Sequence, residues 1–334
     1  MTLETRAWIL KQRPSPEITD QTLVLERRPL AEPGDGEVLV RNLYLSLDPT
    51  NRGWMNEEPT YLPPLPLGAT MRGLTVGRVE RSRSESLAVG ELVQGMGGFA
   101  DYAVAPARAW TKLPPGLDPT QALGVLGHIG LTAYFGLIDV GKAKTGETVL
   151  VSAAAGATGS LVCQIAKQLG CRVVGIAGGS QKCQWLVDAL GVDAAIDYKN
   201  TQNLARAVAA ECPNGADVFF DNVGGTILDA ALANLAMRGR VVLCGAISQY
   251  NRAEVVGPKN YLALLVRRGR MEGFIVLDYL PRALEAIGVL LPWVQQGKLR
   301  LRLDVVDGLE HASTSLRRLF SGENQGKLLI KIAD

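Results

Sequence analysis

Apolar runs of two kinds alternate through the middle of this 334-residue chain. Runs rich in Val, Ile and Ala, such as residues 173–177 and 194–198, have the length and side chains of buried strands. Between them lie runs with apolar residues at helical spacing, such as residues 181–190 and 202–212. Strands that alternate with helices build a parallel sheet, so the pattern predicts a doubly wound α/β domain.

The first 120 residues follow another pattern. Short strand-like runs at residues 6–10, 23–26 and 37–47 are interrupted by glycine and proline, and a proline-rich segment occupies residues 59–66. Proline lacks the N–H that a helix interior or a central strand uses, so this segment is neither. Short strands with such interruptions predict a small, partly open β-barrel.

The end of the chain returns to strand-like runs, at residues 299–306 and 327–330, with a helical run at residues 311–320 between them. We expect this segment to complete the first, β-rich domain. The expected domains are therefore residues 1–122, residues 123–298 and the completing segment 299–334.

A turn of small residues follows the strand-like run at residues 149–151. It matches the dinucleotide fingerprint G-x-G-x-x-G with alanine at the first glycine, and it opens a helix. Small residues let the backbone approach a pyrophosphate, and the N–H groups of the helix N-terminus attract its charge. The turn therefore predicts a dinucleotide site, formed by Ala154, Ala155, Gly156, Ala157, Thr158 and Gly159.

The end of the next strand bears on which dinucleotide binds. Sites for NAD place an Asp or Glu roughly 20 residues after the glycines. Here that place holds Gly178, Gly179 and Ser180, and Lys182 follows. A lysine pairs with a 2′-phosphate, which a carboxylate would repel, so the sequence favours NADPH. The alternative is that Lys182 is a solvated residue at a helix start.

Composition narrows the function classes. The formal net charge of +2 and the 20% of charged residues are ordinary for a globular protein and predict no nucleic-acid partner. No apolar run reaches the length of a membrane span. The N-terminal residues lack the pattern of a signal peptide, so we expect a cytoplasmic protein that does not associate with membranes.

The cysteines and histidines give no metal-binding pattern. All five cysteines lie between residues 163 and 244, none in a C-x-x-C pair, and the chain has two histidines. A catalytic zinc ion needs about three protein ligands. Because the first hundred residues contain neither His nor Cys, we expect no metal site.

Several motifs in sequence order resemble those of one family. The chain is similar to the zinc-free medium-chain dehydrogenases/reductases, and among them to the prostaglandin, 2-alkenal and curcumin-type double-bond reductases. The matching motifs are YLSLDP at residues 44–49, GLTAYFGL at 130–137, VSAAAGATGS at 151–160, DNVGG at 221–225, CGAISQYN at 244–251, MEGFIVLDY at 271–279 and ENQGKLLIKI at 323–332.

The resemblance implies a GroES-like catalytic domain beside a Rossmann domain that binds NADP(H). It implies the reduction of a carbon–carbon double bond conjugated to a carbonyl, by hydride transfer to the β-carbon without a metal. It also implies a homodimer joined at the edges of the nucleotide-binding sheets, for which residues 274–276 are the candidate edge strand.

The resemblance also assigns roles to individual residues. Tyr250 matches the tyrosine that donates a hydrogen bond to the substrate carbonyl. The residues expected to contact the cofactor are Lys182 and Tyr198 at the 2′-phosphate, Asn222 at the pyrophosphate and ribose, Asn324 at the nicotinamide carboxamide, and Thr132 and Gly178 nearby.

Four further residues are expected at the substrate pocket. Many relatives carry a tyrosine directly after DP, whereas this chain has Thr50 and Asn51 there. Arg52 matches the arginine of the family's MRG motif and is either structural or at the pocket rim. His128 stands where methionine is common, and its alternative is a structural role.

Two other functions are compatible with these motifs. An NADPH:quinone reductase would share the fold and cofactor but accept a planar dione. A non-enzymatic NADPH-binding protein would bind the cofactor tightly without turnover. The segments ISQYN and MEGFIVLDY favour the double-bond reductase over the quinone reductase.

Overall fold

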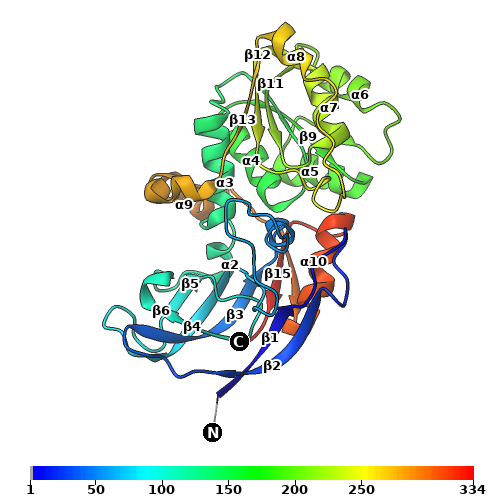
Figure 1. Ribbon diagram of the computed structural model, residues 1–334. Coiled ribbons are helices and arrows are strands. Elements are labelled where there is room, and N and C mark those ends of the chain that lie inside the picture. Colours follow the sequence, from blue (N-terminus) through cyan, green and yellow to red (C-terminus); the bar gives the residue numbers. More distant parts are fainter. Residues whose placement is uncertain (1–2) are drawn as a thin grey trace. The chain divides into compact units, whose positions relative to one another are not determined.

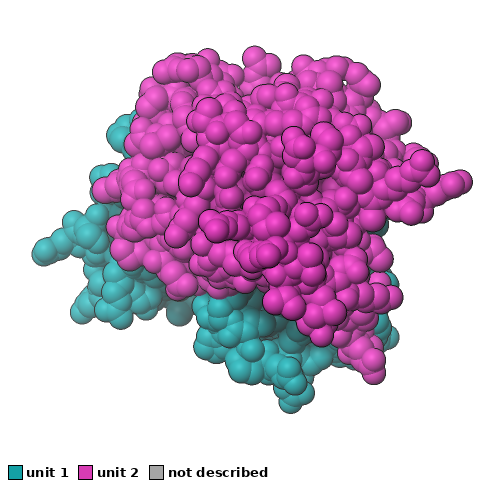
Figure 2. Space-filling model, turned by 90° about the horizontal axis from the view of Figure 1, so that it is seen from above, with its two compact units in different colours: residues 1–123, 303–334 teal, residues 124–302 magenta. Residues whose placement is uncertain are grey.

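The computed structural model describes residues 3–334 of the chain, which divide into two compact units. Unit 1 consists of Met1–Leu123 together with Leu303–Asp334, and unit 2 consists of Gly124–Arg302. Figure 2 shows the two units in teal and magenta. Unit 1 is therefore built from two segments that lie far apart in the sequence.

Unit 1 is a β-rich unit with two sheets (Figure 1). The smaller is an antiparallel pair, β1 (Leu3–Leu10) and β2 (Leu23–Leu30). The larger has seven strands, in the order β14 (Leu303–Asp307), β15 (Lys327–Lys331), β3 (Glu37–Ser46), β4 (Thr75–Ser82), β5 (Leu92–Gly95) and β7 (Trp110–Lys112), with β6 (Tyr102–Pro106) paired to β3.

Five short helices complete unit 1. They are α1 (Thr50–Gly53), η1 (Ala107–Ala109), α2 (Pro119–Ala122), η4 (Leu309–His311) and α10 (Ala312–Ser321). The amphipathic helix α10 buries Leu316 and Leu319 in a core that also contains Leu45 of β3 and Ile330 of β15. Burial of these side chains attaches the C-terminal segment to the N-terminal strands.

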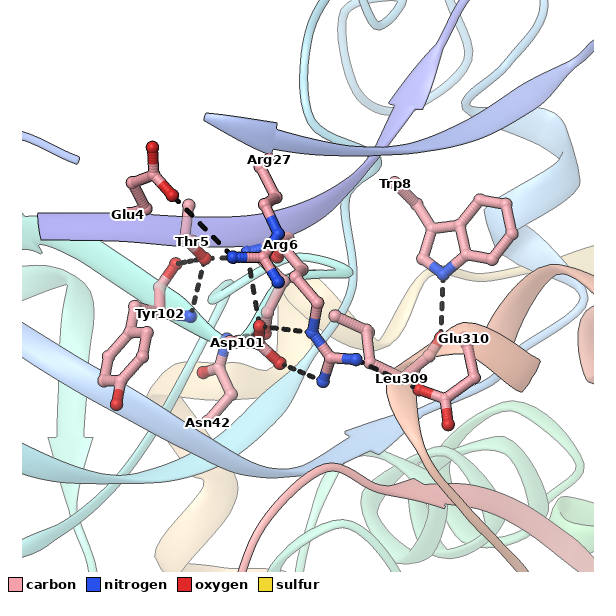
Figure 3. Close-up of polar contacts among 11 residues, drawn as sticks. Glu4, Thr5, Arg6, Trp8, Arg27, Asn42, Asp101, Tyr102, Leu309 and Glu310 are labelled. Atoms are coloured by element: carbon pink, nitrogen blue, oxygen red, sulfur yellow. Dashed lines mark hydrogen bonds and ion pairs between the residues drawn. The ribbon is translucent and has the colours of Figure 1, made fainter. Parts of the chain in front are cut away.

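A polar cluster makes a second attachment within unit 1 (Figure 3). The guanidinium of Arg6 in β1 donates two hydrogen bonds to the Asp101 carboxylate, at 2.8 and 3.0 Å, and a third to Glu310 at 3.2 Å. The Trp8 indole N–H donates to the Leu309 carbonyl at 2.8 Å. A hollow of about 240 Å³ lies beside this cluster, where Arg27 approaches Glu4 at 3.9 Å. Because these charges pair with one another, we interpret the cluster as structural.

Unit 2 contains one parallel sheet of six strands with helices on both faces (Figure 1). Its strand order corresponds to 3-2-1-4-5-6, the dinucleotide-binding arrangement. The strands are β10 (Ala194–Asp197), β9 (Arg172–Ala177), β8 (Thr148–Val151), β11 (Ala216–Asp221), β12 (Leu235–Leu243) and β13 (Arg270–Gly273). The expected fold class is confirmed.

The strands of unit 2 bury both faces, as their continuous apolar sequences predict. Val149 and Val151 of β8 pack into one core, while Leu150 between them packs into the other. The first core receives the helices α3 (His128–Phe135), α4 (Ala157–Gln168), α5 (Ser180–Leu190) and α9 (Ala283–Gln295). The second receives α6 (Leu204–Glu211), α7 (Gly225–Ala233) and α8 (Leu262–Arg267).

Two short helices of other types complete unit 2, the π-helix η2 (Gly136–Val140) and the 3-10 helix η3 (Val276–Arg282). The expected edge strand at residues 274–276 is wrong. The edge strand β13 ends at Gly273, and the Phe274 ring turns onto Phe220 and Tyr279, with ring centroids 6.4 and 6.1 Å apart. Aromatic packing thus ends the strand one residue before the predicted run begins.

Candidate active site

The glycine-rich turn lies at the carboxyl end of β8 and opens α4. Ala153 has a φ of +46°, in the left-handed region that costs a residue with a side chain roughly 1–2 kcal/mol. Its carbonyl accepts a hydrogen bond from the Gly156 N–H at 2.8 Å, which closes the turn. Such local strain is typical of functional sites.

The turn also approaches α4 closely. A Cβ atom on Gly159 would lie 2.3 Å from the Ala153 carbonyl oxygen, so only glycine fits there. Gly156 is the N-cap of α4, Ala155 precedes it in the turn, and Ala157 and Thr158 are the first residues of the helix. The N-terminal N–H groups of this 12-residue helix suit a pyrophosphate. The predicted cradle therefore has the backbone geometry that a dinucleotide requires.

Gly178 and Tyr198 lie together at the carboxyl end of β9, and Lys182 follows in the next helix. A Cβ on Gly178 would be 3.1 Å from the Tyr198 hydroxyl, so the Tyr198 ring lies against this glycine. Lys182 lies in the first turn of α5, whose N-cap is Gly179 with a φ of +95°. The Cε atom of Lys199 is as close, 3.0 Å from the same Cβ position. Two lysines therefore belong to this end of the sheet.

Sequence reasoning missed an acid at this position. Asp197, the last residue of β10, accepts hydrogen bonds from the N–H groups of Gly179 at 2.8 Å and Lys199 at 3.0 Å, and from the Asn200 amide at 2.6 Å. Burial alone would raise the pKa of Asp197, but these hydrogen bonds lower it overall. The Asp197 carboxylate therefore stabilises the turns that contain Gly179 and Lys199. The sequence feature that could have identified it is its position at the end of a strand.

Asn222 lies where β11 ends, beside the end of β8. Its N–H donates to the Ser152 hydroxyl at 2.8 Å, and its side-chain amide donates to the Ser152 carbonyl at 2.7 Å. The strand order reverses between these two strands, and ligands of doubly wound sheets bind at such a switch point. The position therefore suits a residue that contacts the cofactor.

Tyr250 lies in the loop that follows β12, also at the carboxyl ends of the strands. Its hydroxyl oxygen accepts a hydrogen bond from the Ala246 N–H at 3.1 Å. A phenol hydroxyl can donate one hydrogen bond as well as accept. The hydrogen bond orients the hydroxyl, which is what a preorganised donor requires.

Thr132 and His128 both belong to α3. The Thr132 hydroxyl donates to the His128 carbonyl at 2.7 Å, one turn back along the helix. This hydrogen bond occupies the hydroxyl proton within the helix. A role of either side chain toward a ligand stays a prediction.

The four residues after Pro49 form the short helix α1, and the three that were expected at the substrate pocket differ in exposure. The Asn51 side chain accepts from the Asp48 N–H at 2.7 Å and donates to the Arg72 carbonyl at 3.3 Å. Arg52 is buried and donates to the Pro16 carbonyl at 2.7 Å. Both contacts favour structural roles for these two residues, whereas Thr50 is only partly buried and bonds to the Tyr61 hydroxyl.

A buried ion pair lies directly before α1, and sequence reasoning missed it. The Lys327 ammonium donates to the Asp48 carboxylate at 2.7 Å and to the Leu47 carbonyl at 2.9 Å. The Ser46 hydroxyl donates to the other oxygen of the Asp48 carboxylate. Burial lowers the pKa of Lys327, and the attraction of Asp48 opposes that shift. The sequence signal was a charged residue at one end of each of two apolar strands: Asp48 follows β3, and Lys327 is the first residue of β15.

Asn324 lies in the same C-terminal segment, in the turn before β15. Its side-chain amide donates to the Gly326 carbonyl at 2.9 Å, so the residue stabilises this turn. Contact with a nicotinamide carboxamide stays a prediction.

The chain matches two sequence families over most of its length. Residues 6–113 match a family described as the N-terminal domain of oxidoreductase, and residues 157–290 match one described as zinc-binding dehydrogenase. The NADPH-dependent curcumin reductase of Escherichia coli (strain K12) is 40% identical over 335 residues, which cover 98% of this chain and 97% of that protein. The 2-alkenal reductase (NADP(+)-dependent) of Nicotiana tabacum is 41% identical over 303 residues, covering 90% of this chain and 88% of that protein.

A solved structure agrees with these relatives. The CurA of Vibrio vulnificus in complex with NADPH has a TM-score of 0.94 and 40% sequence identity, covering 98% of this chain and 99% of that one. The chain belongs to the zinc-free medium-chain dehydrogenases/reductases. The resemblance expected from the sequence motifs is confirmed.

Two further observations concern this medium-chain reductase. Within residues 3–334, no group of three or more His, Cys, Asp or Glu side chains is arranged to hold a metal ion. The same residues include no helix with the length and apolar character to cross a membrane.

Proposed function

We propose that this protein reduces the carbon–carbon double bond of α,β-unsaturated ketones and aldehydes with NADPH. The observation that carries the proposal is the position of the Tyr250 hydroxyl, oriented by the Ala246 N–H at the carboxyl ends of a dinucleotide-binding sheet. Bound NADPH supplies the hydride for the β-carbon of the substrate. The names of the curcumin and 2-alkenal reductases support this reaction.

The residues of the chain supply binding and charge stabilisation. The turn 154–159 and the N-terminus of α4 hold the pyrophosphate, and Lys182 with Tyr198 holds the 2′-phosphate. As the hydride arrives, negative charge develops on the carbonyl oxygen of the substrate. Tyr250 donates a hydrogen bond to that oxygen, and the resulting enolate is protonated at the α-carbon.

A substrate screen tests the proposed reaction. The oxidation of NADPH would be followed by absorbance with 3-nonen-2-one, an enal and 1,4-benzoquinone, and the products would be identified. We expect the saturated ketone or aldehyde as product. Turnover of the quinone without turnover of the enone would favour a quinone reductase, and tight NADPH binding without any turnover would favour a non-enzymatic protein.

Removal of the Lys182 charge is expected to weaken the binding of NADPH selectively. A charge-assisted phosphate contact contributes about 1.5–3 kcal/mol, so Lys182→Ala should raise the KM for NADPH roughly ten- to a hundred-fold. The KM for NADH should stay nearly constant because NADH lacks the phosphate. Lys142→Ala is a matched control, since this lysine lies at the other end of the sheet, where the Arg240 guanidinium bonds to its carbonyl. Equal effects of Lys182→Ala on both cofactors would contradict the assignment.

A homodimer in the cytoplasm is part of the proposal. The helices that precede and follow the edge strand β13 in the chain carry largely exposed apolar side chains, which we call the apolar edge patch: Leu262, Leu265, Val266, Leu280 and Leu284. An unpaired sheet edge with exposed apolar side chains nearby favours association with a second chain. A two-fold axis would pair this edge with the same edge of the partner and leave neither exposed.

Light scattering is therefore expected to give about 71 kDa, twice the 35.7 kDa of the chain. Leu265→Asp should shift the mass to that of the monomer, because it places charge in the apolar edge patch. Val89→Asp is the control, since Val89 is a comparably exposed apolar residue of unit 1. A wild-type monomer at micromolar concentration, or dissociation by Val89→Asp alone, would refute this interface.

A further inference from the structure

Asp221, the last residue of β11, is fully buried and accepts several hydrogen bonds. One carboxylate oxygen accepts from the Ser152 hydroxyl at 2.8 Å, the Val223 N–H at 2.9 Å and the Gly224 N–H at 3.1 Å. The other oxygen shares the Gly224 N–H at 3.1 Å. Burial raises the pKa of Asp221, and these hydrogen bonds oppose the shift. The carboxylate thus connects the end of β8 with the turn after β11.

The Ser152 hydroxyl extends this connection to Asn222. The Ser152 hydroxyl donates to Asp221 and accepts from the Asn222 N–H, so it acts as donor and acceptor at once. The Asn222 side chain must turn its NH₂ group to the Ser152 carbonyl, because a carbonyl oxygen only accepts. Its amide oxygen is the group left to accept, and among the described residues none donates to it. An acceptor at this position suits a ribose hydroxyl and not a phosphate.

The loop that carries Tyr250 is attached to the same turn. The N–H groups of Cys244 and Gly245 donate to the Asp221 carbonyl at 2.9 and 3.1 Å. Further along, the Ser248 hydroxyl and N–H donate to the Val223 carbonyl at 2.6 and 3.1 Å. The Tyr250 hydroxyl then closes the loop on Ala246.

The turn at residues 223–225 and the loop at residues 244–250 pack closely against each other. Gly224 and Gly225 have φ values of +71° and +57°, which favour glycine. A Cβ on Gly225 would lie 2.9 Å from the Ser248 hydroxyl. The turn therefore cannot shift without moving the loop, and its position depends on the Asp221 carboxylate.

We propose that Asp221 is a positioning residue: through Ser152 it holds Asn222 against the cofactor, and through the turn at Val223 and Gly224 it holds the Tyr250 hydroxyl against the substrate carbonyl. The inference rests on the proposed function for the part that concerns Tyr250. The part that concerns Asn222 requires only that the protein binds NADPH. A misplacement of the order of 1 Å in such a constellation can cost about a hundred-fold in rate.

The test compares Asp221→Ala with Val208→Ala, a buried truncation of α6 on the helix side of the second core. Single-turnover hydride transfer to an enone is measured at saturating NADPH, and NADPH affinity is measured by fluorescence titration. Asp221→Ala should slow hydride transfer about ten- to a hundred-fold and raise the Kd for NADPH about two- to tenfold. Val208→Ala should lower thermal stability while leaving both quantities within about twofold.

A double-mutant cycle separates positioning from stability. If Asp221 acts by aligning the Tyr250 hydroxyl, Asp221→Ala should slow hydride transfer less than about threefold when Tyr250→Phe is already present. If the losses in hydride-transfer rate of the two single variants multiply fully in the double variant, the proposal is overturned. It is also overturned if Asp221→Ala has effects no larger than those of Val208→Ala.

Two arms keep the test decisive. If Asp221→Ala does not fold, Ser152→Ala replaces it, because that change removes only the hydroxyl that links Asp221 to Asn222. If the wild-type protein reduces no enone, the proposed function fails while the titration still tests the positioning of Asn222. An unchanged Kd for NADPH in the folded variant would then overturn the inference.

Discussion

Tyr250→Phe is expected to lower the turnover number for an enone about 10²–10³-fold, with the substrate KM little changed. The Ala246 N–H orients the Tyr250 hydroxyl, which is proposed to donate to the substrate oxygen as charge develops there. Single-turnover hydride transfer is the measurement, because product release does not contribute to it.

Tyr261→Phe is the matched control for this change. Tyr261 is an exposed tyrosine just before α8, and loss of its hydroxyl should leave hydride transfer unchanged. If Tyr250 only packs beside the nicotinamide, its phenylalanine variant keeps the ring and stays nearly as fast as the wild type. A loss below about threefold would therefore exclude the hydroxyl as the donor.

Lys327→Met is expected to destabilise unit 1 by about 3–5 kcal/mol, because it removes the ammonium that pairs with the buried Asp48 carboxylate. Lys327 is 1% exposed, so water cannot replace the ammonium. The double variant Lys327→Met/Asp48→Asn removes both charges and should recover most of the loss. Hydrogen exchange of peptides from β3 and β15 at increasing urea concentration measures the change within unit 1.

Lys331→Met provides the control on the same strand. Lys331 pairs with Asp334 at 2.6 Å, but the Asp334 side chain is 95% exposed, so water screens the pair and it contributes little to stability. A similar loss of stability in the variants of Lys327 and Lys331 would show that the buried pair has no special role. Failure of the double variant to recover would point instead to the packing of the lysine side chain.

The sequence predicted the parts of the fold that local patterns encode. Alternating apolar runs predicted the strands and helices of unit 2, and the small residues at 154–159 predicted the turn that opens α4. The edge strand was placed too late, because contacts of Phe274 with Phe220 and Tyr279 join distant segments. Such contacts depend on tertiary structure, which local patterns do not contain.

Only some residues of the candidate site could be predicted from the sequence. Gly178 and Lys182 were singled out by their place after a strand and Tyr198 by the resemblance, and the structure places all three at the carboxyl end of the sheet. The network of Ser152 and Asp221 was missed because it joins two strands that are 69 residues apart in the sequence. For Arg52 the sequence left two roles open, and its hydrogen bond to Pro16 favours the structural one.

The position of β15 in its sheet has a consequence for biosynthesis. This strand lies between β14 and β3, and its Lys327 pairs with Asp48 across 279 residues of chain. A ribosome adds about 5–20 residues per second, so β3 waits on the order of tens of seconds for its neighbour. Unit 2 is a continuous segment and can fold on the nascent chain during that interval. The open edge of β3 is exposed meanwhile, which makes the unfinished N-terminal sheet the part of the protein most in need of a chaperone.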